Sequence, residues 1–103
     1  MKMLFGYATC KDAKQAEEIA HALVEKRLAA CSVAIHSAKS FFAWKGHSQH
    51  TSESLLLIKT LDKNKRKIER EIKKMHSYDV PCIIFWKAEC SEDYGKWLKN
   101  AVR

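Results

Sequence analysis

The apolar positions of this chain change spacing along its length, and each change marks a predicted element. Residues 2–9 are mostly apolar and aromatic and predict a first strand. Over residues 16–28 apolar side chains recur at i, i+3, i+4, i+7 and i+8, which indicates an amphipathic helix packed on a sheet. Thr9 or Asp12 is expected to cap this helix, since Gln15 follows Asp12 by three positions, as in a capping box.

A hairpin is predicted after this helix. Small and β-branched residues at 29–35 start a second strand, a polar patch at 36–40 interrupts it, and residues 41–44 resume it. Gly46 is expected in the turn, because glycine adopts positive φ without a steric penalty. A third strand is expected over residues 54–60, paired with the second.

The remaining pattern predicts helix, strand and helix. The second helix is expected from Asp62 to about His76. Pro81, the only proline, opens a fourth strand that ends at residue 86 or 87, because proline cannot donate to a central ladder. Ser91 caps the last helix. The order predicts an α+β fold, a ferredoxin-like βαββαβ sandwich with an antiparallel sheet and an extra C-terminal helix.

Both faces of the predicted sheet are apolar. Residues 55–58 and 82–86 are apolar at successive positions, so neither strand has a polar face. Two crossover helices cover only one face, and the short last helix covers the other in part. Because an exposed apolar face of this size marks an interaction surface, we expect an oligomer whose sheets pack together.

Length, composition and net charge restrict the number of domains and the kinds of partner that fit this sequence. The 103 residues form a single domain, 1–103, with 47% hydrophobic and 30% charged residues, as in ordinary globular proteins. The net charge is +7, and much of the excess lies between Lys63 and Lys74. Helical spacing places most of these cations on a solvated face, and a polyanion site is the alternative.

Targeting segments and cysteine pairs are not found. No run approaches the ~20 apolar residues of a membrane span, so we expect a cytoplasmic protein with no membrane partner. The cysteines form no CxxC motif, which predicts reduced thiols and no structural zinc. They are Cys10, Cys31, Cys82 and Cys90.

Catalytic motifs are also missing. The sequence has no GxSxG, HExxH or P-loop, and its three glycines are too scattered to cradle phosphate. Cys31 or Cys82 could pair with His76 as a nucleophile, but nothing in the spacing lowers a thiol pKa. We therefore expect no enzyme, and a redox or thiol enzyme is the third interpretation, after the two binding functions given below.

Two histidine arrangements could ligate metal. His47 and His50, three apart, could share copper or zinc, although two solvated histidines are the plainer interpretation. His76 with the thiol of Cys31 or Cys82 would suit Cu(I), and a hydrogen-bonded, partly buried histidine is the plainer interpretation.

Aromatic side chains offer a nucleic-acid interpretation. Phe41, Phe42, Trp44 and Trp86 could stack on bases. Residues 54–58 lack the Gly- and Phe-rich pattern of RNA-recognition strands, so no nucleic-acid partner is expected.

Five segments between residues 27 and 98 form an ordered set. They are Arg27-Leu28-Ala29-Ala30-Cys31; Ser40-Phe41-Phe42-Ala43-Trp44-Lys45-Gly46; Glu53 with Leu57-Ile58-Lys59-Thr60; His76-Ser77-Tyr78-Asp79-Val80-Pro81; and Asp93-Tyr94 with Lys96-Trp97-Leu98. In this order they resemble the motifs of the CutA divalent-cation tolerance proteins. The sequence departs from that pattern at five places: Ser77 replaces a proline, Ala43 an aromatic, His36-Ser37 a Pro-Gly pair, Ser32-Val33 a Val-Asn pair, and Cys10-Lys11 an Ala-Pro pair.

The resemblance implies a non-catalytic homotrimer with the topology of the PII signalling proteins, in which the long strands extend between subunits. It implies tolerance of divalent metal ions and possible binding of copper or another divalent cation, with no cofactor required. The expected ligand cleft between subunits would contain Trp44, Glu53, Lys59, His76 and Tyr78, and the candidate metal ligands are His76 and Cys31. The alternative is a PII-like trimer that binds a small anion or a nucleotide, suggested by the basic charge and Lys59.

Overall fold

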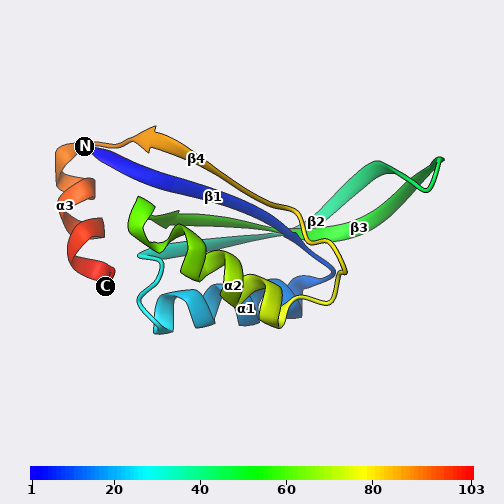
Figure 1. Cartoon of the computed structure of the whole chain (residues 1–103), viewed down its shortest axis with the longest axis horizontal. Coiled ribbons are helices and arrows are strands. Elements are labelled where there is room, and N and C mark those ends of the chain that lie inside the picture. The colour runs from blue at the N-terminus through cyan, green and yellow to red at the C-terminus, as the bar shows by residue number, and fades with distance from the viewer.

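Four antiparallel strands form one sheet in a computed structural model that describes residues 1–103. The strands are β1 (Lys2–Cys10), β2 (Cys31–Trp44), β3 (His47–Thr60) and β4 (Ile83–Glu89), in the spatial order β2-β3-β1-β4. The helices are α1 (Ala13–Glu25), the short 3₁₀ turn η1 (Asp62–Asn64), α2 (Lys65–Met75) and α3 (Glu92–Ala101). Helices α1 and α2 lie on one face of the sheet and α3 lies at one end (Figure 1). The predicted ferredoxin-like order is confirmed.

Helix α1 begins at the predicted cap. The Asp12 Oδ1 atom accepts a hydrogen bond from the Gln15 backbone N–H at 2.8 Å, so Asp12 rather than Thr9 is the N-cap. Its buried face includes Ala16, Ile19 and Leu23. The 3.6-residue period therefore predicted which side of the helix packs on the sheet.

Several predicted boundaries were wrong, for local reasons. Strand β3 begins at His47 and not at residue 54, because pairing with β2 continues as far as the turn. The polar patch at 36–40 does not interrupt β2; a β-bulge between Ile35 and Ala38 absorbs it, with Ser37 at φ 64°. Strand β4 begins only at Ile83, opposite Ala8, and runs to Glu89.

The second helix also starts later than predicted. Residues Asp62–Asn64 form the 3₁₀ turn, and the regular helix begins at Lys65. Asn64 is fully buried, and its Nδ2 donates to the Leu28 backbone oxygen at 3.1 Å. This contact fixes the entry to α2 against the loop between α1 and β2.

The main core lies between the sheet and the two crossover helices. Ala8, Leu56 and Ile58 point from the sheet toward Ile68 and Ile72 of α2, and all five are fully buried. Apolar burial of this kind contributes roughly 25 cal/mol per Å² of surface removed from water.

The opposite face of the sheet is largely uncovered. Helix α3 packs over one end of it through Leu98 and Val102. Beyond that end, Ile35, Ile84 and Trp86 are 44%, 49% and 46% exposed. The predicted apolar face is therefore present in the single chain, and its coverage by other copies stays a prediction.

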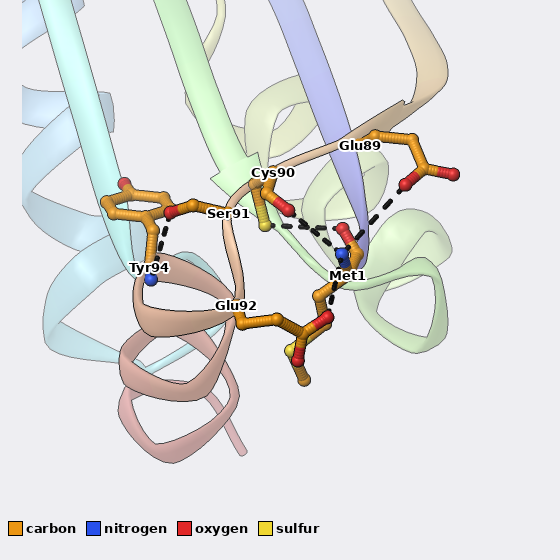
Figure 2. A network of polar contacts seen from close by, with 6 residues as sticks. All are labelled: Met1, Glu89, Cys90, Ser91, Glu92 and Tyr94. Atoms are coloured by element: carbon orange, nitrogen blue, oxygen red, sulfur yellow. Dashed lines mark hydrogen bonds and ion pairs between the residues drawn. The ribbon is translucent and has the colours of Figure 1, made fainter.

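The start of β1 is tied to the connection between β4 and α3 (Figure 2). The Met1 ammonium group donates to the Cys90 backbone oxygen at 2.9 Å and lies 3.4 Å from the Glu92 carboxylate. Ser91 caps α3, as predicted, by accepting a hydrogen bond from the Tyr94 backbone N–H. This network holds α3 at the end of the sheet.

Candidate functional site

Three of the predicted cleft residues meet where the β2–β3 hairpin leaves the sheet. Ser54 is the first residue of β3 that pairs with β1, and Glu53 immediately precedes it. The Tyr78 hydroxyl donates a hydrogen bond to Glu53 Oε2 at 2.7 Å. The His76 ring lies beside the Tyr78 ring, with 4.6 Å between centroids. The end of α2 and the base of the hairpin thus bring Glu53, His76 and Tyr78 together.

Both ring nitrogens of His76 are hydrogen-bonded. Its Nε2 contacts the Thr9 backbone oxygen at 2.6 Å, and its Nδ1 accepts from the Tyr78 backbone N–H at 3.1 Å. A carbonyl can only accept and an amide N–H can only donate, so these partners define a neutral ring with the proton on Nε2. Ligation of a metal through His76 would require one of these bonds to open.

The loop after His76 is joined to α1 by a contact that the sequence did not predict. Gln15 Nε2 donates to the Ser77 hydroxyl at 3.2 Å, while Gln15 Oε1 accepts from the Lys11 backbone N–H at 3.0 Å. Gln15 was expected only as part of a helix cap. The partners are 62 residues apart in sequence, so no local pattern could reveal the pairing.

Glu53 is buried without a cation beside it. Its exposure is 7%, its one hydrogen bond comes from Tyr78, and it takes part in no ion pair. A buried carboxylate normally has a cationic partner, because removal of a charge from water costs several kcal/mol. The site therefore holds a buried carboxyl group that no cation of the single chain contacts.

The acids around Glu53 are held in their neutral forms. Burial, followed by the hydrogen bond to Glu53 and the nearby negative charge, raises the pKa of Tyr78. Burial and then the charge of Glu53 raise the pKa of the Cys10 thiol to about 11 and shift the pKa of Cys82 upward. A catalytic thiol needs a lowered pKa, so Cys82 beside this carboxylate is not an activated nucleophile.

Two other candidates, Lys59 and Cys31, lie at the far end of the strands. Cys31 and Lys59 are cross-strand partners, and Lys59 is also paired with Phe5 of β1. Lys59 lies six positions along β3 from Glu53, about 20 Å along an extended strand. The Lys59 ammonium lies 5.6 Å from the centroid of the Tyr94 ring, a cation–π contact with α3.

Trp44 and the two hairpin histidines lie in the projecting part of the hairpin. Trp44 pairs with His47 beside the turn and is 49% exposed. His47 and His50 are an odd number of residues apart in one strand, so they point to opposite faces and do not share a cation. The His50 ring instead lies 5.7 Å from the Phe41 ring.

Within one chain the ligands of a metal site do not converge. No group of three His, Cys, Asp or Glu side chains is close enough to hold a metal ion. Glu53, His76 and Tyr78 form one cluster, whereas Cys31, Lys59 and Trp44 lie elsewhere. The chain thus supplies one unneutralised carboxylate and lacks a complete set of ligands around it.

Comparison with known proteins gives a consistent result. The family model for the CutA1 divalent ion tolerance protein matches residues 4–101. The divalent-cation tolerance protein CutA of Archaeoglobus fulgidus is 43% identical over 99 residues, which cover 95% of this chain and 96% of that protein. Human protein CutA is 36% identical over 98 residues, or 94% of this chain, and these span 55% of the human protein.

Solved structures agree with the fold. The structure of the periplasmic divalent cation tolerance protein CutA from Archaeoglobus fulgidus superposes with a TM-score of 0.93 at 35% identity and covers 100% of both chains.

None of the helices described above has both the length and the apolar character required to cross a membrane.

Proposed function

The chain belongs to the CutA1 family of divalent ion tolerance proteins, and from this premise we propose that it binds a divalent cation, copper above all, at the Glu53 carboxylate. The observation that supports the proposal most directly is the burial of Glu53 with no cationic partner. A bound divalent ion would neutralise this charge. Copper(II) is favoured because it binds nitrogen and oxygen ligands more tightly than the other divalent first-row metals.

The remaining ligands would come from other copies of the chain. We propose a homotrimer whose open apolar sheet faces are covered and whose hairpins reach neighbouring subunits. The hairpin supports this arrangement, since it extends well beyond the body of the molecule (Figure 1) and contributes to an overall length of 45 Å against a width of 23 Å. Glu53, at its base, would then lie at a subunit boundary.

The proposed role is binding and not catalysis. The raised pKa values of Cys10 and Cys82 support this view, because both thiols stay protonated at neutral pH. No resident cofactor is required for such a role.

We propose a cytoplasmic location. All four cysteines are free thiols, which suits a reducing compartment. The Archaeoglobus relative is described as periplasmic, so detection of this chain in an extracytoplasmic fraction would overturn the assignment.

Calorimetric titration with Cu(II) tests the cation site. We expect Glu53→Gln to weaken binding at least tenfold, about 1.4 kcal/mol, because it removes the buried charge while keeping the shape. Glu18→Gln is the matched control: Glu18 is exposed on α1 and forms no ion pair, so wild-type affinity is expected. Unchanged affinity in Glu53→Gln would overturn the proposal.

A His76→Ala variant in the same titration assigns the role of the histidine. If His76→Ala weakens Cu(II) binding by more than the loss of its two hydrogen bonds explains, His76 is a metal ligand. One of those bonds, to the Thr9 backbone oxygen or from the Tyr78 backbone N–H, would then open when the ion binds. Equal affinity would remove His76 from the metal site.

The second proposal is a small anion or nucleotide bound near Lys59. It is supported by the lack of an ion pair at the Lys59 ammonium, which lies 5.6 Å from the centroid of the Tyr94 ring. A screen of nucleotides and organic anions by thermal shift tests it, since a ligand that binds only the folded state raises the Tm. No shift with any of them would count against it.

A further inference from the structure

Lysine and arginine side chains are dense on the outer surface of α2, and none of them belongs to the metal site proposed at Glu53. Six of the eleven residues of α2 are lysine or arginine, and Lys63 precedes them in η1. Ile68 and Ile72 bury the inner side of the helix, so the basic residues occupy the sides and the outer face. Both α1 and α2 lie on the face of the sheet opposite the open apolar one (Figure 1). The basic face would therefore stay exposed if other copies covered the apolar face.

Contacts within the folded chain account only for the basic residues at the C-terminal end of α2. Lys73 pairs with Glu69 at 3.1 Å and Lys74 with Glu71 at 3.1 Å, and both lie in the last turn, where a helix dipole favours cations. These two lysines stabilise the helix in the ordinary way.

The other five cations have no acidic partner. They are exposed, none forms an ion pair, and no acidic residue lies in the first turn of α2 to offset them. Lys65, Arg66 and Lys67 lie in that first turn, where the helix dipole disfavours cations. Contacts within the folded chain therefore do not explain why the five cations cluster. They are Lys63, Lys65, Arg66, Lys67 and Arg70.

Arg66 and Arg70 lie one helical turn apart at the centre of this outer face. Residues four apart are neighbours on a helix surface, so the two guanidinium groups can reach adjacent phosphates. The surface between Arg66, Arg70 and Lys65 is an open depression with no apolar residue in its lining, which also includes Glu69. Arginine is suited to phosphate because its fork of donors binds two oxygens at once.

We propose that this basic face, defined by Lys63, Lys65, Arg66, Lys67 and Arg70, binds the phosphate backbone of duplex nucleic acid without sequence preference. A single strand is disfavoured because the face offers no aromatic side chain on which bases could stack. A membrane is disfavoured because the face has no exposed apolar residue to insert. The sequence alone favoured a solvated face and no nucleic-acid partner; the lack of acidic partners for these five cations is what changes that expectation.

Fluorescence anisotropy of a labelled duplex of roughly 20 base pairs tests the proposal. We expect binding at 50 mM salt that weakens steeply as salt rises, because phosphate contacts release counterions. The double variant Arg66→Gln/Arg70→Gln should weaken binding at least tenfold and lower the slope of log affinity against log salt by about two.

The matched control is Lys14→Gln/Lys96→Gln, which removes the same amount of charge from exposed positions on α1 and α3. Equal loss in the two variants would overturn the proposal in favour of net charge alone, as would no wild-type binding at 50 mM salt. Binding to phosphatidylglycerol vesicles but not to the duplex would assign the face to a membrane instead. Circular dichroism is used to check that each variant folds, and Cu(II) affinity should be unchanged in all of them because Glu53 lies on a different surface.

Discussion

At the scale of single residues, two buried carboxylates have opposite surroundings. Glu71 accepts hydrogen bonds from the Lys26 ammonium at 2.6 and 2.8 Å and pairs with Lys74. Glu53 is equally buried, at 7% exposure, but has only the neutral hydroxyl of Tyr78. The first arrangement pairs the carboxylate within the folded chain, whereas the second leaves Glu53 without a cationic partner.

The Glu71 pair predicts a defined pH dependence. Hydrogen bonds from Lys26 and Lys74 lower the pKa of Glu71. Its contribution to stability is therefore complete above the unfolded pKa, about 4.3, and is lost as pH falls through the lower folded pKa. Glu71→Gln should reduce the free energy of unfolding by about 1 kcal/mol at pH 7, with a smaller difference near pH 3.

Urea denaturation at the two pH values, at one protein concentration, measures this difference. Glu69→Gln is the control on the same helix, because the Lys73–Glu69 pair is exposed and should contribute only a few tenths of a kcal/mol. A deficit for Glu71→Gln that stays the same from pH 7 to pH 3 would contradict the electrostatic explanation.

At the scale of elements, the hairpin stores strain at its bulge. Ser37 has φ 64°, a left-handed conformation that costs a residue with a Cβ atom about 1–2 kcal/mol relative to glycine. Ser37→Gly should therefore raise the free energy of unfolding by roughly 1 kcal/mol. Ser48→Gly, at a regular position of β3, should instead lower it. If Ser37→Gly lowers the Tm, the left-handed conformation is not what limits stability there.

The hairpin also shows where sequence patterns stop being informative. Residues 16–28 could be predicted because one side of α1 packs on a core, which imposes a period. Residues 47–53 pair only with β2 in a projecting ribbon, so no core imposes alternation and the strand was predicted to start too late. Sequence periodicity predicts the elements that pack on a core, but it does not predict the extent of a two-stranded ribbon.

The candidate site was predictable in part for a related reason. Glu53, His76 and Tyr78 were singled out through motif resemblance, and the fold does bring them together. The contact of Tyr78 with Glu53 spans 25 residues and depends on how α2 returns to the hairpin. The same geometry separates Lys59 and Cys31 from this cluster. The motifs singled out candidate residues but did not show how the fold groups them.

At the scale of the whole molecule, the open apolar face predicts assembly. Ile35, Ile84 and Trp86 are each more than 40% exposed on the same face of the sheet, and exposed apolar side chains grouped on one face are typical of an interaction surface. Light scattering after size exclusion should give three times the chain mass of 11.9 kDa. A mass of 11.9 kDa at micromolar concentration would show that the face is not an interface between copies.

The proposed assembly and the proposed cation site coincide at Glu53, which is buried at the base of the hairpin without a cationic partner. The most direct test is an anomalous difference map from crystals of the protein grown with Cu(II). We predict a peak within about 2.5 Å of a Glu53 carboxylate oxygen, completed by groups from another copy or by water. A map in which a lysine or arginine of a neighbouring copy pairs with Glu53, and copper binds elsewhere or nowhere, would contradict the central claim.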